Sequence, residues 1–272
     1  MKEALAVEDP AQLTAELFRA ILEQRGITVM GKTRARHGET AQFYDQSTSS
    51  PDAQKTPSAD GQLARNPLQV TSRLRCRSPE VSSPAPGGPP PTVIAEHTSL
   101  PLIEDVRVTN KTSQNLHAEL ALRLTGKVNG TGGSFEGGRE AVRKFLLQAG
   151  LQEDQFLLLD GSGLSRRDLV TPAAVTQLLA YAARQPWGLA YEGTLPVAGV
   201  DGSLSERFLN SPAAGLVHAK TGTLSHVNAL SGYGQTLRGK RFVFAIFCNN
   251  HNLPSAKVLA AIDEIVTLLV RE

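Results

Sequence analysis

The triplet Lys220-Thr221-Gly222 places an ammonium group, a small hydroxyl group and a residue without a Cβ next to one another. The flanking β-type residues predict that it lies on a strand or at the end of one. An ammonium beside a threonine hydroxyl can hold a carboxylate or polarise an attacking oxygen, and the glycine lets a substrate backbone pair along the strand. Taken alone, such a triplet is more often part of an edge strand, where an exposed lysine prevents pairing with another chain. Whether the triplet has a chemical function must therefore be judged from the other motifs in the chain.

The segments after the triplet predict an antiparallel sheet backed by a helix. Two β-type runs, 227–236 and 241–248, are joined by a turn at Arg238-Gly239, and short connections make consecutive strands antiparallel neighbours. The last segment has helical spacing and should pack on this sheet. Its predicted apolar face consists of Val258, Ile262, Ile265 and Leu269.

Helices are predicted to dominate the middle of the chain. A polar cluster opens a helix with Leu116, Leu120 and Leu124 on one face, and a further amphipathic helix covers 140–148. Between them, residues 126–138 are predicted to be a glycine-rich loop without the Gly-Lys-Ser/Thr ending of a phosphate loop. An apolar strand over 156–159 precedes a helix that begins with Thr171 as N-cap and Pro172 in the first turn. The expected fold class is α+β, an antiparallel sheet flanked by helices.

Composition divides the chain into three predicted parts. Residues 1–32 contain a helix that starts at Asp9-Pro10 and a short strand over 27–30. Residues 33–92 are rich in Ser, Pro, Gln, Gly and Arg, and we expect a disordered linker there. Globular sequence resumes over 93–272.

Charge and cysteine content exclude several classes of function. The net charge is +2 and there is no basic tract, so nucleic acid is not an expected partner. No apolar run approaches membrane-spanning length, and the first ten residues lack the pattern of a signal peptide. Cys76 and Cys248 lie far apart without metal or redox spacing, and the scattered histidines form no predicted site. We therefore expect neither a metal nor a cofactor.

A second polar group, Ser113-x-Asn115, lies at a predicted helix start upstream of the lysine triplet. The order of the two groups is that of the penicillin-recognising serine enzymes. The chain resembles, in particular, the D-alanyl-D-alanine carboxypeptidase/endopeptidase family of the penicillin-binding protein 4 type, over roughly 8–32 and 93–272. The stretches that carry the resemblance are Asn110-Lys111-Thr112-Ser113-Gln114-Asn115-Leu116, Asp160-Gly161-Ser162-Gly163-Leu164-Ser165-Arg166, Leu195-Pro196-Val197-Ala198-Gly199-Val200-Asp201-Gly202-Ser203-Leu204 and Ala219-Lys220-Thr221-Gly222-Thr223-Leu224.

The resemblance implies acyl transfer to a nucleophilic serine, on a β-lactamase/transpeptidase-like fold. By this resemblance, Ser113 would relay protons to the leaving amine, Asn115 would bind the substrate amide, and Lys220 would supply positive charge near Ser113. Gln114 stands where the family usually has aspartate, a position to which we assign no chemical role.

The same resemblance implies which residues bind substrate. Thr221 and Thr223 would hold the terminal carboxylate of a D-Ala-D-Ala stem peptide of peptidoglycan, and Gly222 would let that peptide pair with the strand. The backbone near Thr223 would contribute an oxyanion donor. β-Lactams would act as inhibitors, and the full-length family would work in the periplasm or otherwise outside the cytoplasm.

One departure from the family pattern leaves undecided whether the chain is catalytically active. No Ser-x-x-Lys, the nucleophile motif of the family, occurs in the sequence. The chain thus resembles the C-terminal part of such an enzyme, with an incomplete fold. The stretch around Ser162 lacks the first glycine of the Gly-x-Ser-x-Gly motif that forms a nucleophile elbow, so a structural role is expected for Ser162. The alternatives are an active serine carboxypeptidase, a catalytically dead remnant that binds peptidoglycan peptides or a partner, and, less favoured, a β-lactamase.

Overall fold

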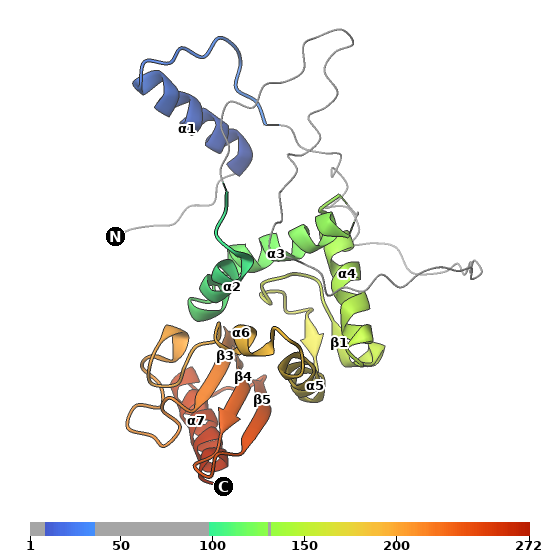
Figure 1. Cartoon of the computed structure of the whole chain (residues 1–272), viewed down its shortest axis with the longest axis vertical. Helices are drawn as coiled ribbons and strands as arrows, with labels where there is room; N and C mark the ends of the chain where they lie inside the picture. Colours follow the sequence, from blue (N-terminus) through green and yellow to red (C-terminus); the bar gives the residue numbers. More distant parts are fainter. Residues whose placement is uncertain (1–8, 36–97, 130–131) are drawn as a thin grey trace, which may run out of the picture. The chain divides into compact units, whose positions relative to one another are not determined.

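The computed structural model describes residues 9–35, 98–129 and 132–272, which divide between a unit within 1–64 and a second within 65–272 (Figure 1). The first unit contains α1 (Pro10–Gln24). As predicted, Asp9 caps this helix, its carboxylate accepting the Gln12 N–H at 2.9 Å. Most of the predicted linker over 33–92 lies outside the described residues.

The predicted strand over 27–30 is wrong, because these residues have no regular secondary structure. One carbonyl group of this stretch, that of Val29, and that of the following Gly31 are bonded to a side chain of α1 and not to a partner strand. The Arg19 guanidinium donates to the carbonyl oxygen of Val29 at 3.2 Å and to that of Gly31 at 2.5 Å. A run of β-branched residues forms a strand only where another strand offers its backbone.

The second unit begins with three helices, α2 (Leu102–Lys111), α3 (Asn115–Val128) and α4 (Phe135–Gln148). The predicted glycine-rich loop over 126–138 is mostly helical: Gly126 lies in α3, and Gly138 lies in α4. A Cβ on Gly138 would lie 2.4 Å from the Leu122 carbonyl oxygen. This glycine therefore permits close packing of α3 on α4, a role that spacing alone does not distinguish from a loop.

A short ribbon and two helices follow. β1 (Phe156–Leu157) pairs antiparallel with β2 (Leu169–Val170), so only the first half of the predicted strand over 156–159 forms. α5 (Pro172–Ala183) begins as predicted, with the Thr171 hydroxyl accepting the Ala174 N–H at 3.1 Å. α6 (Gly188–Glu192) is a short helix.

The three predicted C-terminal strands are confirmed. β3 (Val217–Leu224), β4 (Val227–Gln235) and β5 (Arg241–Asn249) form an antiparallel sheet in the order β3-β4-β5. In its register, Lys220 pairs with Ser231 and Thr223 pairs with Asn228. Among the described residues the outer edge of β3 carries one bridge, between Val197 and His218, and the Ala219 N–H donates to the Pro196 carbonyl oxygen at 2.9 Å, so the edge is open only beyond Ala219.

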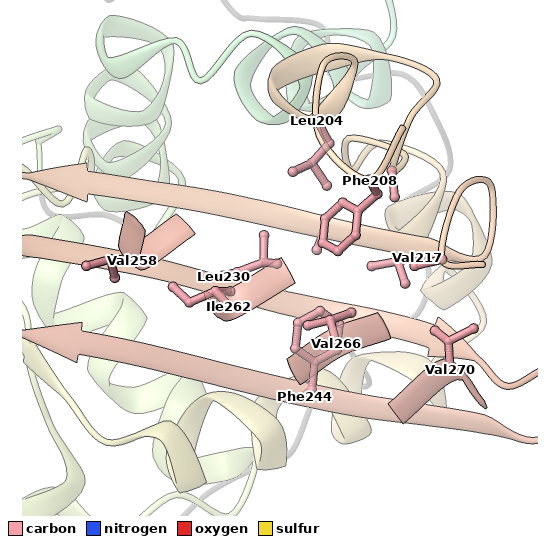
Figure 2. Packing of buried hydrophobic residues seen from close by; sticks show 12 residues of the cluster. Leu204, Phe208, Val217, Leu230, Phe244, Val258, Ile262, Val266 and Val270 are labelled. Carbon is pink, nitrogen blue, oxygen red and sulfur yellow. The ribbon is translucent and has the colours of Figure 1, made fainter. Parts of the chain in front are cut away.

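α7 (Ser255–Arg271) packs on one face of this sheet, as predicted, and forms the main core there (Figure 2). Val258 and Ile262 are buried, but Ile265 and Leu269 are 47% and 39% exposed, so this part of the predicted face is wrong. The buried stripe instead advances by four residues at each step. Its members are Val258, Ile262, Val266 and Val270, which meet Val217, Leu230 and Phe244 of the strands.

The opposite face of the sheet is covered by α5. Tyr233 of β4 is buried with Leu179 and Leu195, and its hydroxyl donates to the Leu179 carbonyl oxygen at 3.0 Å. Burial is the main reason why the pKa of Tyr233 is raised above its ordinary value. Helices on both faces of an antiparallel sheet confirm the predicted α+β class.

Candidate functional site

The fold brings Ser113 and Lys220 into direct contact. The Lys220 ammonium donates to the Ser113 hydroxyl oxygen at 2.8 Å and to the Thr221 carbonyl oxygen at 2.8 Å. Ser113 lies in the turn between α2 and α3 with a φ of 57°, a left-handed conformation that is uncommon for residues other than glycine. A strained turn residue beside a strand lysine, 107 residues away in sequence, is typical of a functional site.

Within the part of the chain that the structure describes, the charge of Lys220 is poorly compensated. Both of its hydrogen bonds run to uncharged oxygens, and partial burial lowers its pKa below the ordinary lysine value. A buried ammonium without a carboxylate partner gains most from an anion supplied by a ligand. The arrangement can therefore bind a carboxylate and influence the proton of the Ser113 hydroxyl.

Thr221 and Thr223 lie two positions apart on β3, so their side chains share one face of the strand. The Thr221 hydroxyl lies 2.8 Å from the Ser203 hydroxyl, and the Thr223 hydroxyl oxygen accepts from the Asn228 amide at 3.3 Å. Between the two threonines, a Cβ on Gly222 would only reach ordinary contact, 3.5 Å from Ala229. Packing inside the chain does not demand glycine at this position.

Asn115 is the first residue of α3, two positions after Ser113. Its side chain is exposed and forms no hydrogen bond to another described residue, in contrast to Ser113. The structure thus places Asn115 beside the Ser113 turn without bringing it onto Lys220.

An ion pair that the sequence did not predict holds the Ser113 turn in place. Lys111, at the end of α2, donates to both carboxylate oxygens of Asp201 at 2.7 and 2.6 Å. Asp201 also accepts the Val197 N–H at 2.9 Å. Gly202, with a φ of 59°, fits closely against this turn, because a Cβ there would lie 2.8 Å from the Lys111 carbonyl oxygen. The stretch 195–204 therefore supports Ser113 through Lys111 and Thr221 through Ser203.

The stretch 160–166 is likewise a structural support. Glu119 of α3 accepts the backbone N–H groups of Gly161 at 3.2 Å and Ser162 at 3.1 Å. The Arg166 guanidinium donates to the Ser225 carbonyl oxygen at 3.1 Å, which ties the stretch to the turn after β3. Among the described residues, the Ser162 hydroxyl accepts the Leu164 N–H, at 3.4 Å, a contact that suits a loop residue.

Removing the charge of Asp201 should destabilise the fold modestly. Partial burial alone would raise the Asp201 pKa, but the hydrogen bonds and charge of Lys111 and the Val197 N–H outweigh it and lower that pKa. The contribution to stability is therefore complete above the unfolded carboxyl pKa and is lost as pH falls through the lower folded pKa. We expect Asp201→Asn to lower the unfolding free energy at pH 7 by about 1 kcal/mol.

Urea denaturation at pH 7 and across the acid range would measure this effect. Glu136→Gln is a matched control, since Glu136 pairs with Arg139 at 3.2 Å on an exposed helix surface. The control should change stability by less than about 0.5 kcal/mol. An Asp201→Asn variant as stable as the unaltered chain at pH 7 would show that the ion pair does not support the turn.

Comparison with known proteins identifies the family to which this fold and this site belong. Residues 80–271 match the D-Ala-D-Ala carboxypeptidase 3 (S13) family. The chain belongs to this family. The resemblance found in the sequence motifs is thereby confirmed.

Individual relatives agree with this assignment. The chain is 32% identical over 268 residues to a D-alanyl-D-alanine carboxypeptidase of Actinomadura sp. (strain R39), covering 97% of this chain and 41% of that protein. Penicillin-binding protein 4 (dacB) from Haemophilus influenzae superposes with a TM-score of 0.60 at 31% identity, over 65% of this chain and 41% of that one. The same protein complexed with a β-lactam gives a TM-score of 0.58 at 30% identity, over 65% and 43%. The chain thus spans about two fifths of the length of these relatives.

The described residues contain neither a candidate membrane span nor a candidate metal cluster. No helix in that part of the chain is both long and apolar enough to cross a membrane. The same residues contain no cluster of three or more His, Cys, Asp or Glu side chains suited to a metal ion.

Proposed function

We propose that this chain carries the substrate-holding part of a serine-type D-alanyl-D-alanine carboxypeptidase/endopeptidase that acts on peptidoglycan stem peptides. The observation that carries the proposal is the 2.8 Å contact between Lys220 and Ser113 beside the open edge of β3. Membership of the S13 family supports the same reaction. We further propose residues 93–272 as the C-terminal part of the catalytic domain, working outside the cytoplasm.

The contacts suggest how each residue would act on a peptide ending in D-Ala-D-Ala. The stem peptide would lie along the open edge of β3, where Gly222 leaves room for its backbone. Its terminal carboxylate would accept hydrogen bonds from Thr221 and Thr223, with Lys220 compensating its charge. Asn115 would donate its side-chain amide to the substrate backbone. Each of these groups is exposed or partly exposed.

In the chemical step, the acyl group would pass from the amide nitrogen of the substrate to a serine oxygen. A serine oxygen attacks the carbonyl carbon of the penultimate D-Ala, the C–N bond breaks, and the leaving amine takes up a proton through the Ser113 hydroxyl. The charge of Lys220 favours this transfer by stabilising negative charge on the Ser113 oxygen. A β-lactam would react similarly, since it offers a strained amide together with a carboxylate for the same threonines.

The absence of Ser-x-x-Lys from the printed sequence favours a second candidate function. Without an attacking serine, the same contacts would bind the peptide without cleaving it. Binding depends on Lys220 and the two threonines, whereas turnover also requires the nucleophile. The two functions therefore predict the same affinity and different products.

The full chain would be tested with a short peptide ending in D-Ala-D-Ala and a matched peptide ending in L-Ala-L-Ala. Calorimetry would measure binding, chromatography would measure released D-Ala, and a fluorescent penicillin would report covalent acylation. Release of D-Ala or acylation supports the enzyme, and selective binding without either supports the binding function. No preference for the D-Ala-D-Ala peptide would overturn both.

Binding of this peptide should weaken at high pH. Because partial burial lowers the Lys220 pKa, its ammonium loses the proton at a lower pH than an ordinary lysine. A bound carboxylate favours the charged form, so the contribution of the Lys220 charge to binding is complete below the Lys220 pKa and is lost above it. We expect the dissociation constant to rise about tenfold per pH unit there. A dissociation constant that is constant up to pH 11 would contradict a role for the Lys220 charge.

A further inference from the structure

A chain of hydrogen-bonded side chains continues inward from Thr223. In the sheet register Thr223 lies opposite Asn228, so both side chains are on one face. Asn228 is fully buried, with its amide nitrogen 3.3 Å from the Thr223 hydroxyl oxygen. On its other side, the Asn228 amide oxygen lies 2.9 Å from Nε2 of His251. Nδ1 of His251 lies 3.0 Å from the Leu253 carbonyl oxygen.

With the Asn228 amide oriented as in this structure, the donors and acceptors of this chain fit only the charged form of His251. The Leu253 carbonyl can only accept, and the Asn228 oxygen can only accept while its amide nitrogen faces Thr223. Both ring nitrogens of His251 therefore face acceptors, and only the imidazolium form donates from both. A buried acceptor that faces another acceptor is unfavourable.

The neutral ring would require a different arrangement. A proton kept on Nδ1 preserves the bond to Leu253 and leaves a lone pair on Nε2. The Asn228 amide must then turn, so that its nitrogen donates to Nε2 and its oxygen faces the Thr223 hydroxyl. Because Asn228 is fully buried, water cannot replace either partner, and the two ends of the chain are coupled.

We propose that His251 and Asn228 are positioning residues that set the direction of the Thr223 hydroxyl proton. With His251 charged, Asn228 donates to Thr223, and the threonine proton is free for a ligand carboxylate. With His251 neutral, Thr223 donates inward to Asn228 and turns its lone pairs toward the ligand. The link to peptide binding rests on the proposed function, whereas the link between the three side chains does not.

Other titratable groups on the surrounding elements are few and do not replace His251 in the chain. His226, in the turn before β4, bonds through Nδ1 to the His251 carbonyl oxygen at 2.8 Å, with the two rings 6.4 Å apart. Arg166 donates to Ser225 in the same turn. Cys248 of β5 pairs with Asn228 in the register, and Lys257 lies in the first turn of α7. None of these is hydrogen-bonded to the Asn228 amide among the described residues.

Nuclear magnetic resonance on the full chain tests the coupling without any ligand. As pH is varied, the signals of the ring nitrogens of His251, the side-chain amide of Asn228 and the backbone amide of Thr223 should change together, with one midpoint. His251→Gln should abolish the titration of Asn228 and Thr223, because the glutamine amide donates to Asn228 at every pH. His226→Gln is the matched control and should leave it intact. The proposal would be overturned if the Asn228 signals did not change when His251 changes protonation state. It would also be overturned if these signals still titrated in His251→Gln.

The same variants connect the chain to peptide binding. The dissociation constant of the D-Ala-D-Ala peptide should rise roughly tenfold as pH increases through the His251 midpoint, since a donor to the carboxylate is lost. His251→Gln should bind with the low-pH affinity throughout this range. If the peptide binds with no such dependence, control of binding by His251 is refuted. If the peptide does not bind at any pH, the proposed function fails, and the magnetic resonance titration alone decides the coupling.

Discussion

Lys220→Ala is expected to weaken binding of the D-Ala-D-Ala peptide by roughly 30- to 100-fold at pH 7. The substitution removes an ammonium that, among the described residues, donates to the neutral oxygens of the Ser113 hydroxyl and the Thr221 carbonyl. A charged hydrogen bond to a ligand contributes about 2–3 kcal/mol when its loss leaves the other partner unsatisfied. Lys220→Arg should give an intermediate affinity, because it keeps the charge but not the compact geometry.

Isothermal calorimetry on the purified full chain would measure this effect. Lys240→Ala is the matched control, since Lys240 is an exposed lysine in the turn before β5, outside the site. It should change affinity less than twofold, as expected for a single charge remote from the ligand. Unfolding of Lys220→Ala should remain cooperative, because the substitution removes a partly buried charge and leaves no partner ion unpaired. A loss of affinity smaller than threefold would show that Lys220 does not hold the carboxylate.

Leu230→Ala is expected to lower the free energy of unfolding by about 3 kcal/mol. Leu230 lies in β4 with no exposed surface and packs in the cluster formed by the sheet and α7 (Figure 2). Truncation removes apolar contacts and leaves a cavity between a sheet and a helix that are both held by other residues. Because β4 is the middle strand, the loss should also loosen β3, which carries Lys220.

Urea denaturation followed by circular dichroism would measure the difference between the variant and the unaltered chain. Leu237→Ala is the control of the same chemistry, since Leu237 is 61% exposed in the turn after β4. Its cost should stay within about 0.5 kcal/mol. A cost below 1 kcal/mol for Leu230→Ala would mean that the sheet and α7 do not form the stabilising core of this unit.

Local patterns were sufficient wherever an element is specified by its own residues. Alternating β-type runs around the Arg238-Gly239 turn correctly predicted β4 and β5, and the Thr171-Pro172 pair predicted the start of α5. Helical spacing placed α7 on the sheet, but its exact buried stripe depended on contacts with the strands. The pattern of residues 27–30 was misleading, since no partner strand pairs with them in the described structure.

The sequence alone determined the family motifs, their order and the strand on which Lys220 lies. Only the tertiary structure decided which side chains meet: Lys220 with Ser113, and Lys111 with Asp201, pairs separated by 107 and 90 residues. The path from Thr223 through Asn228 to His251 likewise depends on the register of β3 and β4 and on the loop after β5. Hydrophobic periodicity specifies the face that an element buries, whereas a polar contact between distant elements depends on how those faces pack.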